Sequence, residues 1–212
     1  MTKAVIFDLD GTIGNTLPLC IAAFRKAVEP FSGKVLSDQD IIATFGPSEE
    51  GTILKLIPDH YQQGVENYLR HYAELHDSCP LPFEGMREII QKLRSSGIIV
   101  AMVTGKGERS CEITLDQYQL RPFFERIETG SPQGQRKKEG IQAVLDSFGL
   151  KPAEAIYIGD APSDIEACHR LGVPIVAAAW AETARPEELI ALKPHRIFYT
   201  VPEFAAYLQG IY

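Results

Sequence analysis

Six short runs rich in β-branched and aromatic residues recur along the chain, and helical patterns separate most of them. Most of these runs are continuously apolar rather than alternating, as parallel strands are when helices cover both faces of their sheet. Strands and helices that alternate at this spacing form right-handed crossovers. The sequence therefore predicts an α/β fold built on a doubly wound parallel sheet. The predicted strands are residues 3–9, 98–104, 124–129, 155–160, 174–180 and 195–200.

Glycine marks the ends of several predicted helices. Gly97, Gly149 and Gly172 each follow the last apolar position of a helical pattern, which is a C-terminal stop signal. The helices predicted between the strands cover roughly residues 85–96, 107–118, 138–148 and 163–171.

Nearly ninety residues without a strong strand signal separate the first two predicted strands. This segment carries helical stretches that open on residues of the types that cap helix N-termini, namely Asn15, Ser37, Ser48 and Asp59. We expect residues 16–80 to form a helical cap domain, inserted into a catalytic core of residues 1–15 and 81–212, with Pro80 and Pro82 in the return linker. Ligands bind at the carboxyl ends of strands in an open α/β sheet, so this cap would cover the site.

Composition limits the partners of the chain. Its 212 residues are 45% hydrophobic and 23% charged, as is usual for a soluble globular protein. The formal net charge of −7 argues against nucleic acid or an anionic membrane as a partner. The sequence shows neither a signal-peptide pattern nor a membrane-length apolar run, and its four cysteines form no C-x-x-C pair. We expect a cytoplasmic protein with free thiols, whose oligomeric state the sequence does not indicate.

Polar residues follow the predicted strands at the points where those strands end. Carboxyl ends of neighbouring parallel strands meet at one edge of a sheet, so carboxylates placed there can converge on one hard cation. A donor set of oxygens without His or Cys suits Mg²⁺. One carboxylate nucleophile, a second carboxylic acid, Mg²⁺ and a lysine fit phosphoryl transfer through an aspartyl-phosphate. The residues concerned are Asp8, Asp10, Thr104, Gly105, Lys106, Asp160 and Asp164, with Lys137 and Lys138 at a helix start.

These motifs resemble the four motifs of the haloacid dehalogenase-like hydrolase superfamily. DLDGT follows an apolar strand, a threonine follows the second strand, and a lysine and then GDxxxD come later, in the order of that superfamily. The resemblance covers essentially the whole chain, including a helical cap between the first two motifs, and implies a Rossmann-like core.

The resemblance also implies a role for each motif residue. Asp8 is expected to be the nucleophile, and Asp10 the acid that protonates the leaving oxygen and then the base that activates water. Because dehalogenases lack a carboxylic acid two residues after the nucleophile, Asp10 indicates phosphate ester chemistry. The implied phosphate ligands are Thr12, Thr104, Gly105 and Lys137; the implied Mg²⁺ ligands are Asp8, the main-chain carbonyl of Asp10, and Asp160, with Asp164 in support.

The third motif departs from the K-P-x-P that many relatives carry. A K-x-E-x-I pattern of other relatives matches Glu139 and Ile141, which places the motif lysine at Lys137 rather than Lys138. After DLDGT, Asn15 stands where relatives carry aspartate, and it is expected to cap the first helix of the cap.

The cap decides the substrate in enzymes of this kind. Residues 44–51 resemble the phosphoglycolate phosphatase-like branch, which implies a small phosphorylated metabolite as substrate; Gly46 and Pro47 form either a loop toward the cleft or an ordinary turn. The return segment also resembles bacterial pyrophosphatases of the same branch, so pyrophosphate is an alternative substrate, and a sugar phosphomutase is another alternative. A non-catalytic phosphate-binding protein is disfavoured because every motif residue is present.

Overall fold

A central parallel sheet organises the protein, and the computed structural model describes residues 1–211. Within that range six strands form the sheet in the order β3-β2-β1-β4-β5-β6, with all neighbours parallel. β1 lies between β2 and β4, and Ala4 pairs with Ile99 on one side and with Ala155 on the other. The predicted doubly wound α/β fold is confirmed. The strands are β1 (Ala4–Phe7), β2 (Ile99–Val103), β3 (Arg126–Glu128), β4 (Ala155–Gly159), β5 (Ile175–Ala178) and β6 (Arg196–Phe198).

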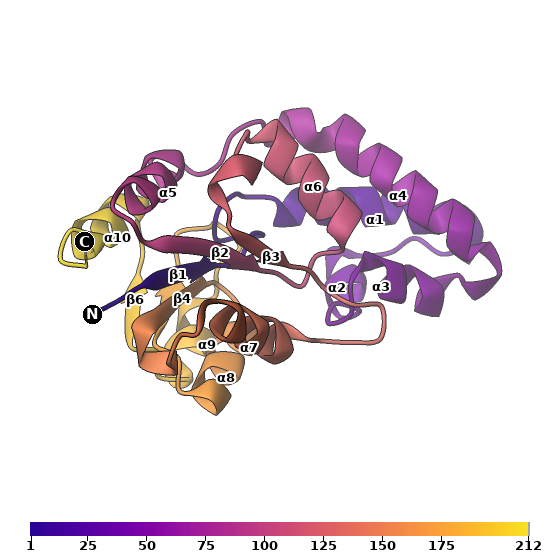
Figure 1. The fold of residues 1–212 in the computed structure, drawn as a ribbon. Coiled ribbons are helices and arrows are strands. Elements are labelled where there is room, and N and C mark those ends of the chain that lie inside the picture. The colour runs from indigo at the N-terminus through magenta and orange to yellow at the C-terminus, as the bar shows by residue number, and fades with distance from the viewer. Residues whose placement is uncertain (212) are drawn as a thin grey trace.

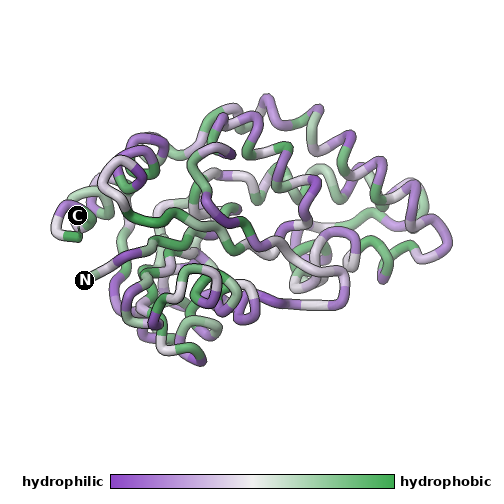
Figure 2. The backbone as a smooth tube through the Cα atoms, in the orientation of Figure 1, coloured by the Kyte–Doolittle hydropathy of each residue, from purple (hydrophilic) through white to green (hydrophobic). Residues whose placement is uncertain are grey.

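Two layers of helices cover the sheet, one on each face (Figure 1). The side chains of β1 are buried on both faces, which explains why its sequence is continuously apolar. Figure 2 shows these hydrophobic strands in the middle of the molecule, between helices that alternate hydrophobic and hydrophilic positions. On one face lie α5 (Met86–Ser95), α6 (Glu108–Gln117) and α10 (Val201–Leu208); on the other lie α7 (Lys137–Phe148), α8 (Pro162–Leu171) and α9 (Pro186–Ala191).

The predicted glycine stops are present. Gly149 ends α7 and Gly172 ends α8, and both adopt the left-handed conformation that glycine accepts without strain. Gly97 also has a positive φ of 77° just after α5. Short 3-10 turns complete the described elements at Pro58–His60, His76–Ser78, Arg121–Phe123 and Pro152–Glu154.

The segment between β1 and α5 is helical, as expected. Its aliphatic and aromatic side chains form an apolar cluster separate from the two clusters on the sheet; within it, Phe24 packs against Tyr68 with ring centroids 4.6 Å apart. Tyr72 joins this segment to α6 through a 2.7 Å hydrogen bond between its hydroxyl and that of Thr114. The division into a cap of residues 16–80 and a core stays a prediction. The helices, which lie beyond the sheet in Figure 1, are α1 (Leu17–Ser32), α2 (Asp38–Ile42), α3 (Glu49–Leu56) and α4 (Tyr61–Leu75).

The expectation that Asn15 caps the first of these helices is wrong. α1 begins at Leu17 with Thr16 at its N-cap, and Asn15 Oδ1 has no hydrogen-bond partner among residues 1–211. Pro18 occupies the first turn and has no N–H for a cap to accept, while the Thr16 hydroxyl donates to Asp10 over 2.5 Å. Ser37 does cap α2, by accepting from the N–H of Asp40 at 3.1 Å.

The expectation that a helix opens on Ser48 is confirmed, because Ser48 holds the N-cap position of α3. Its hydroxyl donates to the Glu50 carboxylate at 2.6 Å and accepts no main-chain N–H. The expectation for Asp59 is not met. Asp59 lies inside a 3-10 turn, so His60 precedes α4.

None of the helices described between residues 1 and 211 combines the length and apolar character that a membrane span needs.

Candidate active site

Three carboxylates meet at the carboxyl ends of β1 and β4. Asp8 directly follows β1, Asp160 directly follows β4, and Asp164 lies in the first turn of α8. One oxygen from each lies within 4.8 Å of the others, because the two strands are neighbours in the sheet. Gly11 makes this approach possible: its φ is +77°, and a Cβ there would stand 2.1 Å from the Asp160 carboxylate.

Lys137 supplies the positive charge in this group. It begins α7, and its Nζ lies 2.5 Å from Asp8 Oδ2 and 2.5 Å from Asp164 Oδ1. Burial by itself would lower the pKa of the lysine, but the attraction of Asp164 and Asp8 raises it well above its usual value, so it is charged. Lys138, the next residue, is exposed. The structure thus brings Lys137, and not Lys138, to the acids.

Negative charge still exceeds positive charge here. Burial raises the pKa of Asp8 to about 6, even though Lys137 acts in the opposite direction. Burial also raises the pKa of Asp160 well above its usual value, and repulsion by Asp8 and Asp164 adds to the shift. Groups that repel one another in this way favour a bound cation.

The side chain of Asp10 faces away from the three acids and toward α1. It accepts a 2.5 Å hydrogen bond from the Thr16 hydroxyl, and Lys106 Nζ lies 3.4 Å from its Oδ1. Cys20 Sγ also lies 3.7 Å from Asp10 Oδ1. Asp8 and Asp10 are therefore separated, each with its own lysine.

The other predicted phosphate ligands lie in different surroundings. Thr104 and Gly105 follow β2 and line the cavity described below. The Thr104 hydroxyl accepts from the main-chain N–H of Lys106 at 3.2 Å. Thr12 is fully buried; its hydroxyl donates to Asp160 Oδ1 at 3.3 Å and its carbonyl accepts from Trp180. Thr12 therefore contacts one of the three acids but does not line the cavity.

Sequence reasoning gave Lys106 no role, although it counts Lys106 among the polar residues at the end of the second predicted strand. Its side chain is 1% exposed and lies 3.1 Å from Cys20 Sγ and 4.2 Å from the centre of the Tyr72 ring. Burial acts to lower its pKa, but the attraction of Asp10 raises it well above its usual value. A buried lysine must be paired, and Asp10 is the partner. The sequence shows that Lys106 follows Thr104 and Gly105, but it does not show that Lys106 contacts residues of α1 and α4.

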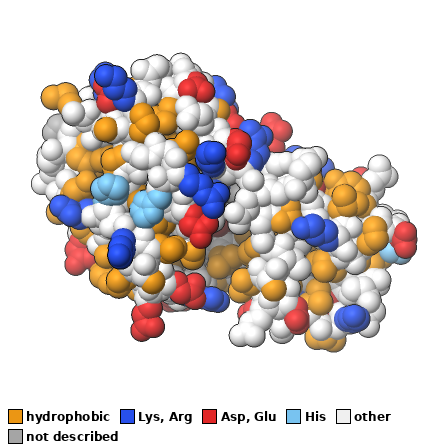
Figure 3. All heavy atoms as spheres, turned by 90° about the horizontal axis from the view of Figure 1, so that it is seen from below, with side chains coloured by type: hydrophobic (Ala, Val, Ile, Leu, Met, Phe, Trp, Pro, Cys, Tyr) orange, Lys and Arg blue, Asp and Glu red, His pale blue; other side chains and the backbone are white. Residues whose placement is uncertain are grey.

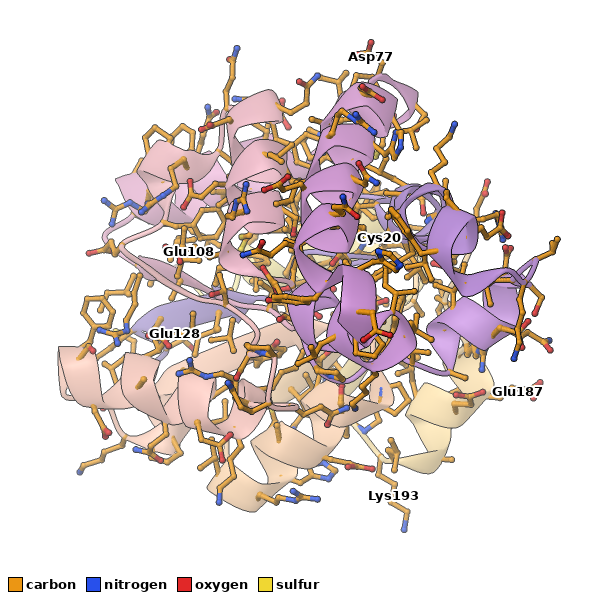
Figure 4. The ribbon with its side chains drawn as sticks, turned by 90° about the vertical axis from the view of Figure 1, so that its right-hand side faces the viewer. Cys20, Asp77, Glu108, Glu128, Glu187 and Lys193 are labelled. Carbon is orange, nitrogen blue, oxygen red and sulfur yellow. The ribbon has the colours of Figure 1, made fainter. Side chains whose placement is uncertain are left out.

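A cavity of about 290 Å³ lies between the strand ends and helices α1, α3 and α4. Figure 3 shows, from below, the hollow between the two parts of the molecule, and Figure 4 looks at the side where these helices lie and labels Cys20 on α1. Gly46 and Pro47 line the cavity, which favours a loop that dips toward the cleft over an ordinary turn. The core lines it with Asp8, Asp10, Thr104, Gly105, Lys106, Gly130, Gly134, Gln135, Arg136, Lys137, Asp160, Ala161 and Ser163.

A buried carboxylate of α3, one of the helices over the cavity, is hydrogen-bonded to the start of α6. Glu49 of α3 is 5% exposed; its Oε2 accepts from the N–H of Gly107 at 2.7 Å, and its Oε1 accepts from the Ser110 hydroxyl. Burial raises the pKa of Glu49, against the attraction of Lys106. Sequence reasoning missed this residue, since a glutamate in the first turn of a helix is common on the surface.

A family profile and a curated relative match most of the chain. The profile of the haloacid dehalogenase-like hydrolase family matches residues 5–178. The chain is 30% identical over 194 residues to the pyrophosphatase PpaX of Bacillus cereus (strain AH820), over 91% of this chain and 89% of the relative.

Two solved structures share the fold. One, named as a predicted phosphoglycolate phosphatase from Haemophilus somnus 129pt, superposes with a TM-score of 0.81 at 21% identity, over 100% of this chain and 98% of the other. The other, a haloacid dehalogenase-like family hydrolase from Streptococcus pneumoniae, superposes with a TM-score of 0.79 at 25% identity, over 98% of each chain.

Proposed function

The chain belongs to the haloacid dehalogenase-like hydrolases and is a phosphatase, and we propose that it hydrolyses a small phosphomonoester through a phosphoryl group carried on Asp8. The observation that supports this proposal most is the division of the two acids of DLDGT. Asp8 lies with Lys137 among the buried carboxylates, whereas Asp10 faces the other wall of the same cavity. This division supports Asp8 as the group that attacks phosphorus and Asp10 as the group that serves the leaving oxygen.

We propose Mg²⁺ as the cofactor, held by Asp8, Asp160 and Asp164. These residues fit the ion because their oxygens lie within 4.8 Å of one another and because mutual repulsion helps to raise the pKa of Asp160. The ion would also take the main-chain carbonyl of Asp10, as the family resemblance implies. When bound, Mg²⁺ offsets the negative charge of the phosphoryl oxygens and of the acids around them.

The reaction then proceeds in two displacements. In the first, a carboxylate oxygen of Asp8 attacks phosphorus, the bond from phosphorus to the leaving oxygen breaks, and the protonated Asp10 gives that oxygen its proton. In the second, Asp10 removes a proton from water, the water oxygen attacks phosphorus, and the bond to Asp8 breaks to release phosphate. Lys137 and Thr104 hold the phosphoryl oxygens during both steps, because the cation and the hydroxyl lie at the same edge of the sheet as Asp8.

Pyrophosphate is the second candidate substrate. The supporting observation is the name of the relative that is 30% identical, a pyrophosphatase. The same two displacements would apply, with phosphate as the leaving group in the first.

A phosphate-release assay tests the proposed function. The wild-type chain and Asp8→Asn are compared on p-nitrophenyl phosphate, alkyl phosphates and pyrophosphate, with Mg²⁺ and with EDTA. We expect turnover that needs both Mg²⁺ and Asp8, while Lys138→Ala, which changes an exposed neighbour of Lys137, keeps wild-type turnover. Turnover in EDTA, or in Asp8→Asn, would contradict the proposal.

The covalent step can be observed directly. p-Nitrophenolate leaves without a proton, so Asp10→Asn should still form the phosphoryl-enzyme from p-nitrophenyl phosphate but lose the base that hydrolyses it. Intact mass spectrometry should then show one added phosphoryl group, and the double variant with Asp8→Asn should show none. A phosphoryl group that persists in the double variant would remove Asp8 from the mechanism.

A further inference from the structure

The half of the cavity that would face the leaving group is built from the helices between β1 and α5. Within residues 16–80, all of which the structure describes, no lysine or arginine lines the cavity, and Glu49 is the one charged lining residue. The remaining lining residues of the segment are apolar or neutral: Leu17, Cys20, Phe24, Phe45, Gly46, Pro47, Thr52 and Tyr68.

Aromatic rings make up much of this wall. The ring of Phe24 lies 5.6 Å from that of Phe45 and 4.6 Å from that of Tyr68, measured between centroids. Phe45 is 36% exposed even though it is a large apolar side chain, and it lines the cavity. Of the three rings, only Phe45 leaves much surface to cover, because Phe24 is 4% and Tyr68 1% exposed. An apolar group that covered Phe45 would gain about 25 cal/mol for each Å² of apolar surface removed from water.

The cationic side chains that line the rest of the cavity already have acidic partners. Within the described chain, the cationic residues that line the cavity are Lys106, Lys137 and Arg136. Lys106 is paired with Asp10 and Lys137 with Asp8, as described above. The Arg136 side chain is 44% exposed and lies 3.4 Å from Glu128, a carboxylate that Arg126 also contacts at 2.6 Å.

A second negative charge on the substrate would therefore meet an unfavourable environment. A carboxylate or a second phosphate placed against the aromatic wall would lose its hydration without gaining a cation. Glu49, whose two oxygens are held by Gly107 and Ser110, adds a carboxylate to the same wall. The chemistry at Asp8 requires one phosphoryl group, but the wall opposite gives a second anion no counter-charge.

We propose that the leaving group is a small, uncharged alcohol with an apolar or aromatic body, and not phosphate or a hydroxy acid. This inference rests on the proposed phosphatase function. The cavity of about 290 Å³ is at the small end of ligand pockets, which limits the alcohol to roughly the size of benzyl alcohol. The preferred substrate class is accordingly the monophosphate ester of such an alcohol.

Substrate comparison in the wild-type chain tests the proposal. Ethyl phosphate and 2-phosphoglycolate are a matched pair, since a methyl group in the first replaces a carboxylate in the second; benzyl phosphate and pyrophosphate extend the series. We expect kcat/KM for ethyl and benzyl phosphate to exceed that for 2-phosphoglycolate and pyrophosphate by about tenfold or more, as a difference of about 1.4 kcal/mol in transition-state free energy gives.

A change of charge in the wall provides a second test. Phe45→Arg places a guanidinium at the cavity and should raise the ratio of kcat/KM for 2-phosphoglycolate over ethyl phosphate by about tenfold. The matched control is Leu54→Arg, which adds the same charge to α3 at a side chain that is 47% exposed and does not line the cavity. This control should leave the ratio unchanged.

The outcomes separate the two proposals. A wild-type preference for 2-phosphoglycolate or pyrophosphate would overturn the inference about the leaving group and leave the phosphatase function intact. An equal shift of the ratio in Leu54→Arg would also overturn it, because the effect would then come from overall charge. Failure of every substrate in the series, p-nitrophenyl phosphate included, would instead refute the proposed function.

Discussion

Replacing Lys137 by methionine tests the electrostatic account of the site most directly. The change keeps an unbranched side chain but removes the ammonium that lies 2.5 Å from a carboxylate oxygen of Asp8 and 2.5 Å from one of Asp164. Lys138→Met is the matched control, because it removes the same charge from the next residue of the same helix, where the side chain is exposed.

The magnitude follows from burial. The side chains of Lys137, Asp8 and Asp164 are 12%, 6% and 0% exposed, so water screens their interaction little. Removing one member of a buried ion pair costs about 3–5 kcal/mol of the free energy of unfolding, because the remaining charge is left without a partner. An exposed substitution such as Lys138→Met changes that free energy by about 0.5 kcal/mol or less. Since domains are stable by only about 5–15 kcal/mol, the difference is easily measured.

The penalty should depend on pH in a defined direction. Burial raises the pKa of Asp8 to about 6, and Lys137 opposes this shift, so in Lys137→Met the pKa of Asp8 rises further. An acid with a raised pKa in the folded state binds protons on folding, and stability therefore falls as pH rises from the unfolded pKa toward the folded one. The penalty is fully present above the raised pKa of Asp8 in Lys137→Met. It diminishes as pH falls toward about 6 and is smallest below that, where Asp8 is protonated in both folded proteins.

Urea unfolding in EDTA at pH 8 and at pH 5 measures both effects. We expect Lys137→Met to be destabilised more at pH 8 than at pH 5, and Lys138→Met to match the wild type at both. Added Mg²⁺ should restore part of the stability of Lys137→Met without restoring phosphate release, since the ion offsets the acids but does not replace the lysine at the phosphoryl group. Equal penalties at the two pH values, or equal losses in the two variants, would refute the reasoning.

Three further predictions concern the rest of the site. Asp10→Asn should lower kcat for ethyl phosphate by about 10²- to 10⁴-fold with an unchanged circular dichroism spectrum, because the leaving oxygen loses its proton donor; near-normal turnover would remove Asp10 from catalysis. Lys106→Met should destabilise the chain less than Lys137→Met in urea, because Asp10 is 23% exposed while Asp164 is fully buried; a larger loss would contradict this. Mg²⁺ at about 100 times its Kd should stabilise the wild type by about 2.7 kcal/mol in thermal unfolding, and Asp160→Asn much less; equal gains would place the ion elsewhere.

Much of the sheet could be predicted because one physical signal determines it. A strand covered on both faces must be apolar throughout, and β1 and β4 are. Helix ends were predictable where one residue determines them, as Gly149 does in the left-handed conformation. Asn15 failed as a predicted cap because Pro18 removes an N–H from the first turn, a local feature that residue type at one position does not convey.

The site was predictable to the extent that strand order determines it. Asp8 and Asp160 meet because β1 and β4 are neighbours, and any doubly wound sheet with this motif order brings them together. Lys106 and Glu49 were not predictable, because their partners lie on helices packed from other parts of the chain. A buried charge is recognised only when its surroundings are known.

Reaction type and substrate preference come from different parts of this chain, and this limits what a relative's name can transfer. The groups that would handle phosphorus, such as Asp8 and Lys137, follow a strand or begin a helix of the sheet layers, so the sheet determines where they lie. The groups that would face the leaving group, such as Phe24 and Phe45, come from helices whose packing depends on their own apolar cluster. Identity of 30% to a pyrophosphatase therefore supports shared chemistry at Asp8, whereas the leaving group must be inferred from the wall that this chain builds.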